Sequence, residues 1–162
     1  MDTAEVMAAS LHAELLRRSA TIGTAESITG GGLGALMTAA PGASETYRGG
    51  VVSYATDVKQ GLLGVSAETI EKYGVVSAEC ARELALGARS LLACDYAVST
   101  TGVAGPDSQE GKPVGTVFVA VADGVDVTVK ELHLSGDRSE IRDTSCREAV
   151  SAVLAVVVGV AD

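Results

Sequence analysis

The sequence predicts an α/β fold, namely a three-layer α/β/α sandwich with a mixed, mostly parallel sheet and one late antiparallel hairpin. Helical and strand patterns alternate through the early part of the chain, which is typical of parallel strands covered by helices. Asp123-Gly124 separates two alternating apolar segments and is a strong hairpin signal. The length of 162 residues suits one domain, residues 1–162, and no internal repeat or linker interrupts it.

The first half of the chain alternates between amphipathic and short apolar segments. Val6, Leu11, Leu15 and Leu16 recur at helical spacing and predict the first helix. The strand that follows ends shortly before three glycines, which predict a turn, and the next helix stops at a Pro-Gly pair. The predicted elements are, in order, helix 3–19, strand 21–26, turn 30–32, helix 33–40, strand 50–54 and helix 57–63.

The second half contains a second glycine-rich turn and the hairpin. Asp137 is a suitable N-cap for the last helix. Ligands of such sheets bind beyond the carboxyl ends of the strands, so both glycine-rich turns are expected to border the site. The predicted elements are helices 67–73 and 78–93, strand 96–101, turn 102–106, strands 115–122 and 126–134, and a helix from about 137 to 158.

Composition restricts the kinds of partner. The formal net charge is -9, so no basic face is available for a nucleic acid, whose binding depends on neutralised phosphates. The longest apolar stretch, residues 149–161, is shorter than the roughly 20 residues that span a bilayer. We therefore expect no nucleic acid and no membrane as partner, and we interpret that stretch as a buried or interface helix, which suits a homo-oligomer, a dimer or higher.

The cysteines and histidines indicate the compartment and the absence of a metal. The three cysteines are widely spaced and form no CxxC, which favours reduced thiols. No basic region followed by an apolar run begins the chain, so a cytoplasmic location is expected. His12 and His133 fall in different elements without a second ligand at metal-binding spacing. We expect neither a metal nor a cofactor.

Ser27 is the first candidate for catalysis. It lies at the end of a predicted strand, in the segment TAESITGGG just before a helix. The free N–H groups of a helix N-terminus can bind a phosphate, or the oxyanion that forms when a hydroxyl attacks a carbonyl. The alternative is that Ser27 or Thr29 serves only as an N-cap. The glycines match neither the GxGxxG fingerprint nor a P-loop, and the serine lacks the GxSxG frame.

Lys59 is the second candidate, in the segment SYATDVK. It falls on the first turn of a predicted helix among apolar neighbours. A lysine whose pKa is lowered by burial can act as general base for a serine, and Tyr54 is near enough in sequence to relay the proton or orient the amine. The alternative is an ordinary solvated lysine on the surface.

Two further segments have binding potential. Thr101 and its neighbouring hydroxyl precede Gly102 and Gly105, which makes a cradle for a ribose or phosphate, or alternatively an ordinary tight turn. Arg138 and Arg142 are four residues apart and share one helix face. A planar guanidinium suits a phosphate, while the alternative is a salt-bridged surface.

Taken in this order, the segments resemble the successive signatures of the CinA C-terminal domain family. The resemblance covers about residues 21 to 142 and rests on AESITGG, GGVVSYATDVKQGLLGV, YGVVS, TTGVAGPD, KPVGTVFVAV and GDRSEIR. The family includes stand-alone, metal-free amidohydrolases that convert nicotinamide mononucleotide to nicotinate mononucleotide and ammonia. The resemblance therefore implies this activity in pyridine nucleotide salvage, in a form without a molybdopterin-binding-like domain.

The resemblance also implies roles for individual residues. Ser27 falls on the nucleophile, Lys59 on the base and Tyr54 on its partner, five residues apart as in the family pattern. The helix arginine falls on Arg142 or alternatively on Arg138, and the oxyanion is expected on backbone N–H groups of residues 27–32. The residues expected to bind the substrate are Thr29, Gly30, Gly31, Thr101, Gly102, Gly105, Arg138 and Arg142.

Two departures from the family and two other functions are relevant. Ile28 stands where many members have cysteine, and the loop 107–111 is short against the usual glycine-rich insert. A non-catalytic nucleotide-binding or competence-associated regulatory module has the same fold, and a structural oligomer subunit would suit the apolar last helix. The set of Ser27, Tyr54 and Lys59 favours an enzyme acting on a small nucleotide, because a pure binder needs no base beside a serine.

Overall fold

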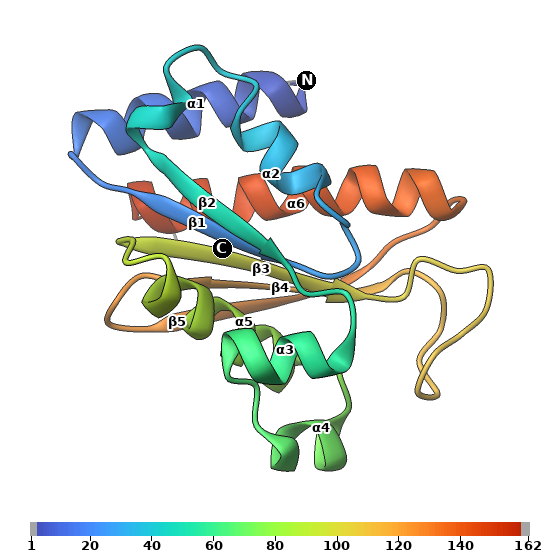
Figure 1. Cartoon of the computed structure of the whole chain (residues 1–162). Helices are drawn as coiled ribbons and strands as arrows, with labels where there is room; N and C mark the ends of the chain where they lie inside the picture. The colour runs from blue at the N-terminus through green and yellow to red at the C-terminus, as the bar shows by residue number, and fades with distance from the viewer. Residues whose placement is uncertain (1–2, 160–162) are drawn as a thin grey trace.

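The computed structural model describes residues 3–159 and confirms the three-layer α/β/α fold (Figure 1). Its strands are β1 (Ile22–Glu26), β2 (Tyr47–Val52), β3 (Tyr96–Gly102), β4 (Thr116–Ala122) and β5 (Val127–His133). They form one sheet in the order β2-β1-β3-β4-β5. β1 pairs in parallel with β2 and β3, whereas β4 pairs antiparallel with β3 and β5. Only β4 therefore runs against the others, and β4 with β5 forms the predicted hairpin.

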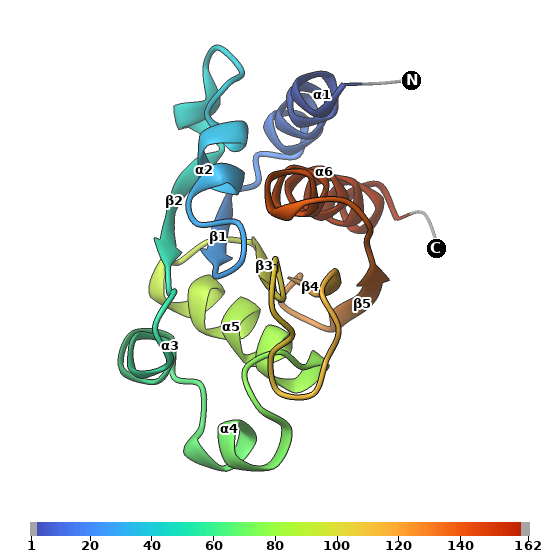
Figure 2. The ribbon, with the colours of Figure 1, turned by 90° about the vertical axis from the view of Figure 1, so that its right-hand side faces the viewer.

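Helices cover both faces of the sheet, as Figure 2 shows. One face carries α1 (Ala4–Arg17), α2 (Gly32–Met37) and α6 (Arg138–Val158), and the other carries α3 (Thr56–Leu63), α4 (Ala67–Tyr73) and α5 (Ala78–Leu91). A short 3-10 helix, η1 (Ala43–Glu45), precedes β2. Within residues 3–159, none of the helices combines the length and apolarity that crossing a membrane requires.

The sheet separates two apolar cores. Along β4, the odd-numbered residues from Val117 to Val121 belong to the core beneath α1 and α6, and the even-numbered ones from Phe118 to Ala122 belong to the core beneath α5. All seven residues of β4 are buried, because helices cover both sides of this strand. The alternation predicted for the strand is therefore a division between two cores and not between core and solvent.

A close approach of α3 to α5 places the first helix of the site. A Cβ atom added at Gly87 on α5 would overlap with the backbone carbonyl of Leu63 at the end of α3. Only glycine permits this contact. The contact fixes α3, which contains Lys59, against the core beneath α5.

Several predicted element ends differ from the structure, most of all those of β2, which ends at Val52 and not at residue 54, and of α2. β2 begins at Tyr47 and not at Gly50, because the pairing with β1 starts at Tyr47. This pairing forms although the glycines of β2 favour strands weakly. α2 ends at Met37 and not at residue 40, since the Thr38 hydroxyl donates to the carbonyl of Ala35 and Pro41 follows. α6 ends at Val158, and residues 160 and 161 of the predicted apolar stretch lie outside the described residues.

The carboxyl ends of β1, β2 and β3 meet at one edge of the sheet, because these three strands are parallel. Glu26 ends β1, Val52 ends β2 and Gly102 ends β3. Residues just after these three strand ends, Ser27, Tyr54 and Val103, line a common pocket. Of the two glycine-rich turns expected to border the site, the second lines this pocket and glycines 30–32 of the first do not.

Candidate active site

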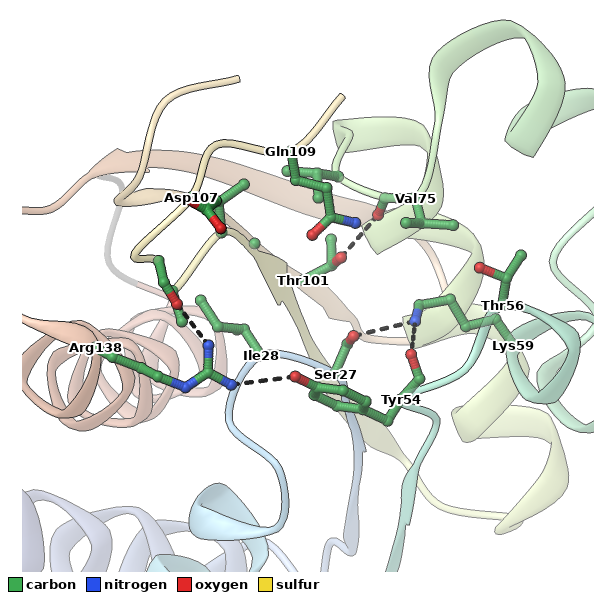
Figure 3. Close-up of a pocket in the computed structure, with 15 residues that line it drawn as sticks. Ser27, Ile28, Tyr54, Thr56, Lys59, Val75, Thr101, Asp107, Gln109 and Arg138 are labelled. Atoms are coloured by element: carbon green, nitrogen blue, oxygen red, sulfur yellow. Dashed lines mark hydrogen bonds between the residues drawn. The ribbon is translucent and has the colours of Figure 1, made fainter. Parts of the chain in front are cut away.

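A pocket of about 180 Å³ lies at this edge of the sheet (Figure 3). Five separate segments of the chain contribute to its wall. They supply Ser27 and Ile28; Tyr54, Thr56 and Lys59; Val75 and Val76; Thr101 to Gly105 with Asp107 and Gln109; and Arg138. The pocket thus joins three predicted catalytic residues and four of the predicted binding residues.

Ser27 and Lys59 are in contact within this pocket. The Lys59 amine donates to the Ser27 hydroxyl oxygen at 3.1 Å, and also to the carbonyls of Ser53 and Tyr54 at 2.8 and 2.9 Å. Only 1% of Lys59 is exposed to solvent. The alternative of a solvated surface lysine is therefore wrong, because α3 begins at Thr56 and directs this residue under the strand ends.

Burial changes the acidity of Lys59. Desolvation lowers the pKa of its amine from the ordinary value, since removing a charge from water disfavours the ammonium form. Cys80 and Glu110 oppose this shift, but to a smaller extent. Burial also raises the pKa of the Cys80 thiol to about 11, so this neighbour is uncharged near neutral pH. Lys59 consequently releases its proton more readily than a lysine on the surface.

The two carbonyl acceptors suit a neutral amine. Such an amine has two N–H bonds, which the carbonyls of Ser53 and Tyr54 accept, and its lone pair remains for the Ser27 O–H. Ser53 also connects the two catalytic strand ends, because its N–H and its hydroxyl both donate to the carbonyl of Glu26, at 2.7 and 3.1 Å. Glu26 directly precedes Ser27, so one local network positions Ser27 and Lys59.

The Tyr54 side chain contacts a different partner from the one expected. Its hydroxyl accepts a hydrogen bond from Arg138 at 3.2 Å, and only its backbone carbonyl bonds to Lys59. The ring is largely exposed at the mouth of the pocket. Tyr54 therefore lies in the predicted site, but the structure places its hydroxyl at the rim with Arg138.

The N-terminus of α2 is filled by the chain's own carboxylate. Glu26, 2% exposed, accepts hydrogen bonds from the N–H groups of Gly31, Leu33 and Gly34 at 2.8 to 3.1 Å. The Thr29 hydroxyl donates to the same carboxylate at 2.6 Å. An anion here is favoured by the helix dipole, so a substrate phosphate has no place at this helix.

Three predicted binding residues consequently lie behind the pocket and not in it. Thr29, Gly30 and Gly31 shape the loop after Ser27, with Gly30 and Gly31 at φ of 57° and 103°, but they do not line the pocket. Among the described residues, the N–H groups of Ile28 and Thr29 have no hydrogen-bond acceptor. Of these two residues only Ile28 lines the pocket, so its N–H is the free donor of this turn at the pocket wall.

The two arginines of α6 have different surroundings. Arg138 lines the pocket and donates to the carbonyl of Gly105 at 2.7 Å, besides its bond to Tyr54. Arg142 does not line the pocket. Its guanidinium donates to the carbonyls of Ile28 and Thr29 at 3.2 and 3.4 Å, behind the nucleophile. The arginine that faces the pocket is therefore Arg138, and Arg142 fixes the loop after Ser27.

The second glycine-rich turn forms the opposite wall, as predicted. Gly102 and Gly105 line the pocket, and a Cβ atom at Gly102 would lie 2.7 Å from the carbonyl oxygen of Thr116. Thr101 also lines it, but its hydroxyl donates to the carbonyl of Val75 at 2.7 Å. Thr101 thereby joins the end of β3 to the segment between α4 and α5.

The loop that contains Glu110 and Lys112 also binds this segment, and sequence reasoning did not predict these contacts. The Glu110 carboxylate accepts the N–H groups of Val75 and Val76, both at 2.9 Å, and the Lys112 amine donates to the carbonyl of Val76. Gly74, at φ of 80°, leaves room for this carboxylate. The glutamate-glycine-lysine sequence in a loop and the glycine before two valines were the available signals.

The histidines lie apart from the pocket. His12 bonds through Nδ1 to the Thr46 hydroxyl at 2.7 Å, and His133 pairs with Glu131 on β5. Across residues 3–159, no three His, Cys, Asp or Glu side chains gather in a group suited to a metal ion.

Comparison with known proteins identifies the family. The model of the CinA C-terminal domain matches residues 4–157. A CinA-like protein from Frankia casuarinae is 47% identical over 146 residues, which cover 90% of this chain and 34% of that protein. One from Solibacter usitatus is 44% identical over 142 residues, covering 87% and 33%. The chain thus spans about a third of the length of these relatives.

Solved structures agree in fold. A competence-damaged protein (CinA) superfamily protein from Klebsiella pneumoniae superposes with a TM-score of 0.94 at 29% identity, covering 98% of this chain and 99% of that one. The competence/damage inducible protein CihA from Agrobacterium tumefaciens superposes with a TM-score of 0.91 at 32% identity, covering 96% and 99%. This chain belongs to the CinA C-terminal domain family.

Proposed function

We propose that this protein is a serine amidohydrolase that converts nicotinamide mononucleotide to nicotinate mononucleotide and ammonia. The observation that carries the proposal is the buried Lys59 amine at hydrogen-bond distance from the Ser27 hydroxyl, inside the pocket at the carboxyl ends of the strands. A serine beside a base is the arrangement of a nucleophile, and membership of a family that includes amidohydrolases agrees with it.

In the first step, neutral Lys59 accepts the proton of Ser27 as Ser27 Oγ attacks the carboxamide carbon. The carbonyls of Ser53 and Tyr54 keep the amine oriented, since they accept its two N–H bonds. The carbonyl oxygen of the substrate becomes an oxyanion, for which the free N–H group of Ile28 at the pocket wall is the available donor.

In the second step, Lys59 returns the proton to the departing nitrogen, and ammonia leaves. The C–N bond breaks as the tetrahedral intermediate collapses to an ester of Ser27. Lys59, neutral again, then removes a proton from water as the water oxygen attacks the ester carbonyl. When this second intermediate collapses, Lys59 returns that proton to Ser27 Oγ, which restores the serine hydroxyl and releases nicotinate mononucleotide. One group thus acts as base and as acid in turn, which requires a pKa near the working pH.

The rim of the pocket suits the phosphate. A volume of about 180 Å³ is below the roughly 300–1,000 Å³ of sites that enclose a drug-sized ligand, so a nucleotide would extend beyond it. Arg138 lies at that mouth, and its guanidinium is the cation available there for the phosphate. Glu26 excludes the anion from α2, which leaves the side of Arg138 and Gly105 for it.

An ammonia-release assay with nicotinamide mononucleotide tests the proposal. The wild-type protein should release ammonia and nicotinate mononucleotide in equal amounts, also after treatment with EDTA, because the proposed mechanism needs no metal ion. Ser27→Ala should lose more than nine tenths of kcat, more than about 1.4 kcal/mol in barrier, and still bind the nucleotide.

The matched control is Ser90→Ala, which removes an exposed hydroxyl on α5 far from the pocket and should keep full activity. Binding without ammonia release by the wild type would favour a regulatory module instead. Retention of more than about a tenth of kcat by Ser27→Ala would exclude Ser27 as the nucleophile.

A further inference from the structure

Two polar side chains of the pocket have no assigned partner. Asp107 and Gln109 line the pocket, and neither side chain forms a hydrogen bond or ion pair with any residue of the described range 3–159. In Figure 3, Arg138 enters the pocket from one side and Lys59 from the other, with Ser27 between them; Asp107 and Gln109 lie across from Tyr54. They border the space between the catalytic pair and the rim.

The loop that contains both residues is fixed at its two ends. Arg138 donates to the carbonyl of Gly105 just before it, and Glu110 and Lys112 bind the segment between α4 and α5 just after it. Glu110 has φ of 53°, an uncommon conformation for a residue with a side chain, and is retained by its two backbone donors. A loop tied in this way presents Asp107 at low entropic cost to a ligand.

Charge decides which part of a nucleotide can meet Asp107. An ionised carboxylate accepts hydrogen bonds but donates none, so its ligand must supply N–H or O–H groups. A phosphate would be repelled, all the more in a chain of net charge -9. Between a carboxamide at Ser27 and a phosphate at Arg138 lies the ribose, whose vicinal hydroxyls are donors that a carboxylate is suited to bind.

We propose that Asp107 is a specificity-determining residue that binds the 2′- and 3′-hydroxyls of the substrate ribose, with Gln109 beside it. The inference rests on the proposed function and deepens it, because it assigns a residue to the recognition of the substrate ribose. Asp107 does not take part in the chemistry at Ser27. It selects among nucleotides that all present the same carboxamide.

The test compares nicotinamide mononucleotide with its 2′-deoxy and 3′-deoxy analogues. Wild-type kcat/KM should favour the parent by at least about tenfold, as expected for lost hydrogen bonds to a charged group. In Asp107→Ala this preference should fall below about threefold, mainly through a higher KM for the parent. Asp126→Ala, which removes a carboxylate from the hairpin at the opposite end of the sheet, should keep the wild-type preference.

Binding measured by calorimetry in the Ser27→Ala background separates this inference from the proposed function. Absence of ammonia release with a ribose preference that depends on Asp107 would refute the amidase and support the inference. The inference would be overturned if the wild type is active and Asp107→Ala loses kcat/KM equally on all three nucleotides, since Asp107 would then contact the carboxamide N–H₂. Asp107→Asn keeps the size of the side chain but removes its charge. If this variant kept the wild-type preference for the parent nucleotide over its deoxy analogues, the charge of Asp107 would not be what recognises the ribose.

Discussion

Lys59 combines two properties that rarely occur together, a buried amine and a complete set of acceptors. Burial alone would leave an ammonium ion short of partners, at a large free-energy cost. Here the carbonyls of Ser53 and Tyr54 and the hydroxyl of Ser27 accept all its N–H bonds when it is charged. Loss of one proton leaves the two carbonyl bonds intact and turns the lone pair to Ser27. The site therefore accommodates both protonation states, as a residue that gives and takes protons requires.

Substitutions at Lys59 test its role as base. Its pKa is lowered by burial, so kcat/KM of the wild type should rise with pH through one group below the ordinary lysine value and then level off. Lys59→Arg retains the positive charge but cannot lose a proton, and should be nearly as inactive as Lys59→Ala. Initial rates of ammonia release between pH 6 and 10 give both profiles.

If Lys59 only attracted the substrate phosphate, Lys59→Arg would keep most of its kcat and change mainly KM. An active arginine variant would therefore contradict the assignment. Circular dichroism of each variant controls for loss of fold, because α3 and α5 pack closely beside this residue.

At the scale of elements, α6 contributes one arginine to the pocket and another to the loop after Ser27. Arg138 and Arg142 are one turn apart on the same face, yet Arg138 lies at the pocket and Arg142 behind the loop after Ser27. The difference comes from the path of the two loops above α6 and not from the helix itself. Arg142 reaches the carbonyls of residues 28 and 29, whereas Arg138 reaches that of Gly105.

The two arginines should respond differently to alanine substitution. Arg138→Ala should raise KM about tenfold for nicotinamide mononucleotide and leave nicotinamide riboside, which has no phosphate, almost unchanged. Arg142→Ala should lower kcat for both substrates alike, because it loosens the loop after the nucleophile. It should also destabilise the fold by about 1–2 kcal/mol through two lost hydrogen bonds. Kinetics on the two substrates and urea unfolding measure these effects, and the opposite pattern would restore Arg142 as the phosphate ligand.

Most elements follow from local sequence, whereas the partners of polar side chains do not. Apolar periodicity and turn residues predicted each helix and strand, with errors mainly at the ends of β2 and α2. The distinction between Arg138 and Arg142 depends on loops more than 30 residues away in sequence, 33 for Gly105 and over 110 for residues 28 and 29. No pattern along α6 contains that information.

The role of Glu26 has a signal in the local sequence, but the prediction did not use it. A charged residue in the buried segment TAES, just before a glycine-rich helix start, is a signal for a carboxylate that neutralises a helix N-terminus. Interpreting those N–H groups as open to substrate led to Thr29, Gly30 and Gly31 as ligands. The structure shows instead that the chain satisfies them itself and leaves the N–H groups of Ile28 and Thr29.

For the whole molecule, the buried lysine of the site is expected to reduce the stability of the fold. Most of the fold buries apolar side chains in two cores on either side of the sheet. Lys59 is among the largest fully buried side chains, and desolvation lowers the pKa of its amine. Proteins commonly lose stability at the site where they act. The contribution of Lys59 to the free energy of unfolding should therefore depend on pH.

The sign of that dependence follows from proton linkage. A lysine whose folded pKa lies below its unfolded value near 10.5 binds fewer protons in the folded state. Its favourable contribution is complete above the unfolded pKa and is lost as pH falls through the folded pKa. The free energy of unfolding of the wild type should therefore rise relative to that of Lys59→Met between pH 7 and pH 9. The rise is up to about 1.4 kcal/mol for each pH unit over which the amine is neutral in the folded state and charged in the unfolded state.

Urea unfolding at pH 7, 8 and 9, followed by circular dichroism, measures the difference. Lys72→Met, at an exposed lysine of α4, should show no such trend. A difference between wild type and Lys59→Met that stays constant across this range would place the folded pKa of Lys59 above it, and a lysine charged throughout cannot be the base that the amidase mechanism needs.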